Sequence, residues 1–574
     1  RVSDSVKLLL DANSRISLSN NDSGADNTIF GFDAGKLLTS GCNENVIIGD
    51  LAMDAADGTE SYNTAIGSSA MSGVDEVGYE ANSNVAIGAN ALIGGALGSS
   101  VFTGNIAIGV NAFNSTGTNP STGQIAIGFA ALTALTSGAG NTAVGYQCLD
   151  GTDDGASNTA VGYSALSANC GDDNTAIGHS ALLLTTASGN IAIGNYAGDA
   201  LVGGASNTIL GVQALSSATT AASNVAIGYS AMNDVPSGQA VTGCVAIGQT
   251  ALLGAGGTTT GINYTVAVGH SALTALTSGE GNVAIGYQSL DAEATGDSST
   301  AVGYQTLTAQ TGIDGKVANT AVGYGSIKSI TNGIENTAVG YGTLDAAAHD
   351  ETGNTAIGAS AMGAVAQQEA SGSGRIAKEN VALGAEALFG GGLASTKDLI
   401  GNVAIGYQAM DATAGNAQTG VVAIGHSALG ALTSGVGNTA VGYLAGQYLT
   451  TGGGNTIFGY NAFGTSTSGT NLTASSDNVA IGKDSLGGDW VDDGGGAESN
   501  VALGSGTMVA AINGANHNVA IGRHSQAGNI SGDFNISVGS LSGDTITTGS
   551  NNILLGYHTE ASAVDVTYEI VIGT

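Results

Sequence analysis

The sequence predicts an all-β protein, a parallel β-solenoid of about thirty short coils. A unit of the form N-[TVI]-A-[IV]-G recurs along the chain, and its glycine appears thirty times between Gly31 and Gly573. β-Branched residues stand at alternate positions of each unit, as they do in strands. The nine residues from the asparagine to the fourth residue after the glycine keep a constant length, so every insertion falls in one loop.

Each position of the unit forms a column of similar residues. The second position is Thr, Val or Ile in all thirty coils, the third is Ala in 23, and the fourth is always apolar. A small residue follows three positions after the glycine, and most often Leu or Met after that. We therefore expect each coil to contain a short strand, a glycine corner, a second short strand and a loop. Successive coils would stack about 4.8 Å apart.

The first position is Asn in 24 coils. Stacked identical amides can form a hydrogen-bonded ladder along the axis of a cross-β stack. Asparagine is also a common turn residue. The sequence leaves both explanations open.

Two columns vary together, which indicates that they share one core. Where the residue four past the glycine is itself Gly, the next coil replaces its usual Ala by a larger residue; the pairs are Gly35 with Ile47, Gly198 with Ile209, Gly446 with Ile457, and Gly543 with Leu554. Packed interiors conserve volume in this way. The second and fourth columns, on the opposite strand face, are also largely apolar. A strand that is apolar on both faces is normally buried on both, so we expect three chains to pack around one axis.

Composition narrows the classes of function. The chain of 574 residues has 45 Asp and Glu against 11 Lys and Arg, a net charge of −34. Such a chain is a poor partner for nucleic acid, and no apolar run is long enough to insert into a membrane. Its four cysteines do not suggest a disulfide framework. The acidity either keeps the protein soluble or binds divalent cations in acidic loops; we expect no other cofactor.

No catalytic motif is present, so we expect no enzyme activity. The variable loops are the candidate binding sites. One loop holds Arg375 and Lys378, and another holds the single tryptophan among acids: Trp490, Asp489, Asp492 and Asp493. An aromatic ring with carboxylates could contact a glycan or a receptor, or hold a cation; alternatively, the loop folds over its own tryptophan. Tyr follows the glycine in eleven coils, a column more typical of packing than of a binding strip.

The units N-[TV]-A-[IV]-G-Y-x-A-L resemble repeats in tail-fibre proteins of bacteriophages and giant viruses. They are also similar to the left-handed parallel β-roll of trimeric autotransporter adhesin heads. This resemblance implies a left-handed, homotrimeric fibre on the outside of a virion. Its partners would be other virion or fibre proteins and a host-surface glycan or protein.

Other functions fit the same repeat. A bacterial extracellular adhesin or surface filament is the main alternative; a polysaccharide depolymerase would need a pair of carboxylates in a groove, and an ice-binding solenoid would need an unbroken Thr array. In domain terms, we expect a lead-in strand segment over 1–26. The solenoid shaft with its variable loops would occupy 27–574 and stop in the middle of a coil.

Overall fold

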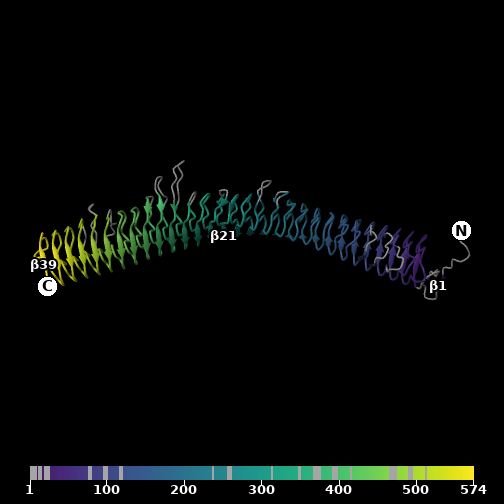
Figure 1. Cartoon of the computed structure of the whole chain (residues 1–574), viewed down its shortest axis with the longest axis horizontal. Helices are drawn as coiled ribbons and strands as arrows, with labels where there is room; N and C mark the ends of the chain where they lie inside the picture. Colours follow the sequence, from purple (N-terminus) through teal and green to yellow (C-terminus); the bar gives the residue numbers. More distant parts are fainter. Residues whose placement is uncertain are drawn as a thin grey trace. The chain divides into compact units, whose positions relative to one another are not determined.

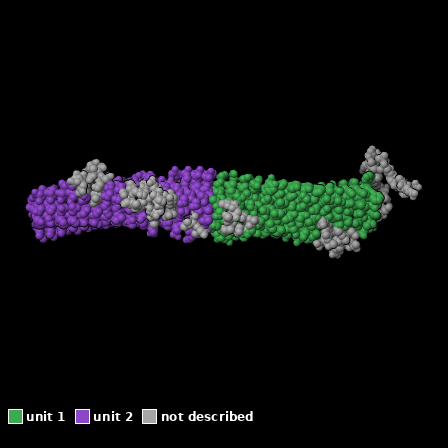
Figure 2. All heavy atoms as spheres, turned by 90° about the horizontal axis from the view of Figure 1, so that it is seen from above, with its two compact units in different colours: residues 1–281 green, residues 282–574 purple. Residues whose placement is uncertain are grey.

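The computed structural model describes residues 9–10, 16–17, 26–74, 81–94, 101–114, 120–235, 238, 240–254, 261–311, 315–346, 351–365, 377–390, 398–413, 417–464, 475–488, 496–510 and 513–573. These residues contain β-strands, turns and loops but no helix, and hence no helix that could cross a membrane. The chain forms two compact units, residues 1–281 and 282–574, which are coloured separately in Figure 2.

The first unit contains fourteen three-residue strands, each paired in parallel with the next (Figure 1). Its other strands include β1 (Leu9–Leu10) and β2 (Ile16–Ser17), which pair antiparallel. The fourteen strands are β3 (Thr28–Phe30), β4 (Val46–Ile48), β5 (Thr64–Ile66), β6 (Val85–Ile87), β8 (Ile106–Ile108), β10 (Ile125–Ile127), β11 (Thr142–Val144), β12 (Thr159–Val161), β13 (Thr175–Ile177), β14 (Ile191–Ile193), β15 (Thr208–Leu210), β16 (Val225–Ile227), β17 (Val245–Ile247) and β18 (Val266–Val268).

The second unit contains sixteen such strands, again parallel and in register. They are β19 (Val283–Ile285), β21 (Thr300–Val302), β23 (Thr320–Val322), β24 (Thr337–Val339), β25 (Thr355–Ile357), β27 (Val381–Leu383), β29 (Val403–Ile405), β31 (Val422–Ile424), β32 (Thr439–Val441), β33 (Thr456–Phe458), β34 (Val479–Ile481), β35 (Val501–Leu503), β36 (Val519–Ile521), β37 (Ile536–Val538), β38 (Ile553–Leu555) and β39 (Ile570–Ile572).

The predicted parallel β-solenoid is therefore confirmed, but one part of the predicted coil is wrong. The residues after each corner glycine form a turn, not a second strand. A second strand of two residues does occur in seven coils, on the other side of the loop, just before the first column. These short strands also pair in parallel; they are β7 (Phe102–Thr103), β9 (Ser121–Thr122), β20 (Gly296–Asp297), β22 (Gly315–Lys316), β26 (Ala377–Lys378), β28 (Leu399–Ile400) and β30 (Gln418–Thr419).

The first-column asparagines form an amide ladder in the interior. Asn336 is fully buried, and its backbone N–H and side-chain Nδ2 both donate to Oδ1 of Asn319, at 2.8 and 3.1 Å. Its Nδ2 also donates to the carbonyl of Glu351 at 2.6 Å, and its own Oδ1 accepts from Asn354. The ladder, rather than turn formation alone, explains the repeated Asn, because each side chain bonds the coils on both sides.

An interruption of the ladder at Ser299 is bridged by Gln310, a side chain from the loop side of the same coil. Serine is too short to continue the row of amides. Nε2 of Gln310 donates to Oγ of Ser299 at 3.0 Å, and Oε1 of Gln310 accepts from Nδ2 of Asn319 at 2.9 Å. Both side chains are fully buried. The missing amide is thus supplied from a different position of the same coil, and buried polar groups remain paired.

The corner glycines stack directly on one another. Gly145 has φ of 146°, and a Cβ added there would lie 2.1 Å from the carbonyl oxygen of Gly162 in the next coil. No side chain fits at that distance, which explains why this position never varies. The turn that follows also uses left-handed backbone at non-glycine residues, such as Gln147 and Leu149 with φ of 47° and 53°.

The core is formed by the third column of the strand and the residues three and four past the glycine. Nearly all of these side chains are fully buried. A Cβ built on Gly198 would lie 2.8 Å from Cδ1 of Ile209, and one built on Gly446 would lie 2.9 Å from Cδ1 of Ile457. The predicted contact between the two columns is therefore confirmed there.

The pair at Gly543 differs. Its nearest side chains are those of Ser537 and Ile546, not that of Leu554. This glycine lies in a more polar stretch of the core, where Ser537 takes the place of the usual Ala and accepts a hydrogen bond from Gln526 at 3.1 Å. The volume left by the missing side chain is filled there by neighbours from other positions.

Replacing Gly198 by Leu is expected to destabilise the first unit by roughly 1–3 kcal/mol, because the new side chain overlaps Ile209. The backbone itself accepts leucine, since Leu182 and Leu215 occupy the same column with φ of 49° and 50°. Chemical unfolding followed by circular dichroism measures the change.

The double variant Gly198→Leu with Ile209→Ala tests whether the two columns touch. Its free energy of unfolding should exceed that of Gly198→Leu alone, because the alanine makes room for the leucine. Equal stability of the single and double variants would show that the two side chains do not share a space.

Candidate functional site

The outward strand face consists of the second and fourth columns, and it carries no charged residue in any of the thirty coils. Its side chains are only half-buried: Ile177, Ile193 and Leu210 remain 38%, 37% and 44% exposed. The alternating third column is buried beneath it. In a chain of net charge −34, an uncharged apolar face of this kind along both units is a candidate for contact with another molecule.

Runs of stacked aromatic rings, called the aromatic ridge below, form where the residue after the corner glycine is Tyr, Phe or His in successive coils. In the first unit, Phe129, Tyr146, Tyr163 and His179 stack with ring centroids 5.0–5.2 Å apart and nearly parallel planes. The second unit contains two further runs, Tyr287 to Tyr341 and Tyr407 to Tyr460. Because each ring covers its neighbour's face, the ridge offers ring edges and hydroxyl groups to solvent rather than open faces.

Most of the site residues predicted from the loops lie outside the described residues. These are Trp490, Asp489, Asp492, Asp493 and Arg375. Lys378 is described: it lies on β26, is half-buried, and its Nζ is 3.7 Å from Oε1 of the neighbouring Glu379. The structure therefore places Lys378 on a short strand beside the variable loop, in an ion pair with the adjacent Glu379.

Seven aspartates occupy the position five past the corner glycine, a column that the sequence analysis missed although its spacing is constant. Burial raises the pKa of five of these carboxyl groups above the ordinary value, and backbone hydrogen bonds offset part of the increase. These five, called the corner aspartates below, are Asp150, Asp199, Asp291, Asp345 and Asp411. The folded chain therefore binds protons at these sites more tightly than an unfolded chain does.

The four cysteines are all buried and unpaired. Burial raises the pKa of the Cys148 thiol to about 12 and that of Cys244 to about 11. Burial also raises the pKa of Cys42, whose Sγ donates to the buried carboxylate of Glu60. Thiols held in the protonated form are poor nucleophiles and poor metal ligands, so the cysteines belong to the core.

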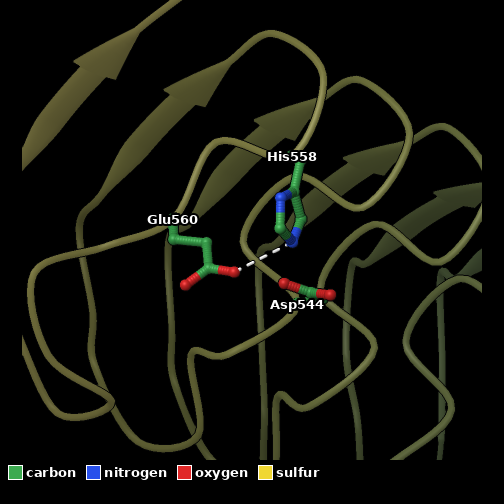
Figure 3. A group of neighbouring side chains, drawn as sticks. All are labelled: Asp544, His558 and Glu560. Carbon is green, nitrogen blue, oxygen red and sulfur yellow. Dashed lines mark ion pairs between the residues drawn. The ribbon is translucent and has the colours of Figure 1, made fainter. Parts of the chain in front are cut away.

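One group of side chains in the described part of the chain has the composition of a metal site. Asp544, His558 and Glu560 each bring one ligand atom to within 4.8 Å of the others. Nε2 of His558 lies 3.1 Å from Oε1 of Glu560, and both carboxylates lie at the Nε2 end of the ring (Figure 3). The sequence analysis missed this group, because Asp544 and His558 are fourteen residues apart and meet only through the stacking of two coils.

The corner aspartates predict a pH dependence with a defined sign. Their folded-state pKa is raised, so the proton-linked stability is fully present below the unfolded Asp pKa of about 3.9 and is lost as pH rises through the folded-state value. The melting temperature should therefore increase as pH falls from about 7 toward about 4. Falling charge repulsion acts in the same direction.

Asp199→Asn combined with Asp411→Asn isolates this contribution. The double variant should be more stable than the parent at neutral pH and should show a flatter dependence of melting temperature on pH. Asp154→Asn, at an exposed loop acid, is the matched control for loss of charge. A pH profile altered equally by the control would assign the effect to net charge alone.

No family model matches the chain, and no curated protein matches it. The parallel β-solenoid is therefore established by strand pairing, register and burial alone. Its function has to be inferred from what the wall of the solenoid exposes and from what its loops contain.

Proposed function

We propose that the chain is the structural shaft of a virion fibre, an outward-facing appendage that reaches a host surface. The observation that carries this proposal is the uniformity of the repeated strands: the fourteen of the first unit and the sixteen of the second each pair in register within their unit, while insertions fall only in the loops. Repetition of one supersecondary unit produces length and stiffness. A catalytic groove would require local departures from the repeat, and the described wall has few.

The proposed assembly is a homotrimer in which the outward strand faces meet. Two properties of that face support self-association. It is uncharged, so copies with a net charge of −34 can approach there without burying like charges. It is also half-exposed and apolar along each unit, and burying such a stripe against a second copy is favourable at about 25 cal/mol per Å².

Contact with the host surface is assigned to the loops that carry Trp490 and Arg375, with a glycan or a protein as the partner. The wall repeats the same residues, whereas recognition needs a feature that differs from coil to coil. A tryptophan among acids is the most distinctive loop sequence in the chain. Loops positioned by a rigid scaffold are a common location for binding residues.

Imaging of native particles tests the proposal. Antibody raised against the purified chain and coupled to gold is expected to label thin appendages on virions. Label confined to the envelope of bacterial cells would overturn the virion assignment and identify an extracellular adhesin or filament instead.

Two measurements accompany the imaging. Light scattering of the intact chain should give about three times 55.5 kDa, and a stable soluble monomer would contradict the trimer.

Particles whose fibre lacks residues 487–496 should keep their appendages but attach to host cells less well. Unchanged attachment after removal of both this loop and the loop that carries Arg375 would make the chain a spacer, with recognition elsewhere.

A further inference from the structure

The coil that contains Gly556 departs from the repeat at one core position. Four residues past the corner glycine, the other coils carry Leu, Met, Phe, Ile, Gly or Gln, whereas this coil carries Glu560, the single acid of that column. Two residues past the glycine, in a column of varied residues that also contains His524, it carries His558. Glu560 is exposed, and the next strand has Val571 where most coils have Ala. An imidazole and a carboxylate therefore lie side by side on the surface.

The preceding coil supplies a third ligand. Asp544 stands five past its own corner glycine, the same position as the corner aspartates. Its Oδ1 has almost no access to solvent and no hydrogen-bond partner. A buried carboxylate oxygen without a partner is unfavourable, and a cation beside it would remove that penalty.

The same column provides an internal comparison. Asp150 and Asp199 also have a buried Oδ1 without a partner, but the coils that follow them carry Ser164 and Gln213 where His558 stands, and Leu where Glu560 stands. An unpaired oxygen is therefore a property of the corner. What distinguishes Asp544 is that the next coil brings an imidazole and a second carboxylate to it.

We propose that Asp544, His558 and Glu560 bind one divalent transition-metal ion, for which Zn²⁺ is the best-fitting probe. The mixed nitrogen and oxygen donor set suits Zn²⁺ and its neighbours, whereas Ca²⁺ takes oxygen ligands only. With ligand bonds of about 2.0–2.2 Å, adjacent donors around zinc lie roughly 3 Å apart. The His558 to Glu560 separation of 3.1 Å already has that value, and a carboxylate oxygen of Asp544 lies within 4.8 Å of both ligand atoms.

Such an ion would join two successive coils from outside the core. Asp544 belongs to the coil of β37 and the other two residues to the coil of β38. Bound metal stabilises the folded state because an unfolded chain does not hold the three ligands together. The inference is independent of the proposed fibre function, since it concerns only what these two coils bind.

Titration of the chelator-treated full-length chain with zinc salt, followed by calorimetry, is the test. One saturable site per chain is expected, accompanied by a rise in melting temperature. Co²⁺ in place of Zn²⁺ should give visible absorption bands of a nitrogen- and oxygen-ligated ion. The fluorescence of Tyr557, whose ring lies 6.1 Å from that of His558, should respond to Cu²⁺ at the same stoichiometry.

His558→Ala and Asp544→Asn should each abolish the saturable site, while Asp199→Asn, the same substitution in a coil without the histidine, should leave it intact. Circular dichroism confirms that all three variants fold. Absence of saturable binding, or binding that survives His558→Ala, would overturn the proposal. Binding of several zinc ions per chain with low affinity, lost when salt is added, would also overturn it, because such binding would reflect the acidic surface. Displacement of Zn²⁺ by equimolar Ca²⁺ would overturn it as well.

Discussion

The buried amide ladder is the interaction on which the rest of the structure depends. Each coil must give its first-column N–H an acceptor inside an interior that excludes water, since an unpaired buried N–H is costly. The side-chain oxygen of the preceding Asn is that acceptor: Oδ1 of Asn319 accepts from the backbone N–H of Asn336. Nδ2 of Asn336 donates to the same oxygen and to the carbonyl of Glu351. Each asparagine must therefore lie directly beside the asparagine of the preceding coil. This requirement fixes the coil-to-coil register and confines changes of length to the loop.

Other side chains of the same or the next coil compensate for departures from the repeat, which distinguishes structural variation from functional variation. Gln310 completes the ladder beside Ser299, and Ile209 fills the space beside Gly198. Both changes preserve the wall. The departure at Glu560 differs because, together with His558, it places ligand atoms on the surface beside Asp544. The outward strand face, in contrast, carries no charged residue in any coil, which is what the proposed trimer requires.

The strand of each coil and its core columns could be predicted from the sequence, because period-two patterning and compensating volumes are local signals. The residues after the glycine could not: small and apolar residues there suit a strand or a turn equally, and only backbone angles such as φ of 53° at Leu149 distinguish them. The asparagine column was ambiguous, since a ladder and a turn both favour Asn. The group around His558 was missed because its members meet only once the coils are stacked in register.

Unfolding of Asn336→Asp measures the contribution of the ladder most directly. The substitution keeps the shape of the side chain but removes the Nδ2 donor to Asn319 and to the carbonyl of Glu351. We expect a loss of stability of at least about 1–3 kcal/mol for the buried acceptors left unpaired. Asn332→Asp, at an exposed position in the loop just before Asn336, should have little effect. Equal stability of the two variants would contradict the central role of the amide ladder.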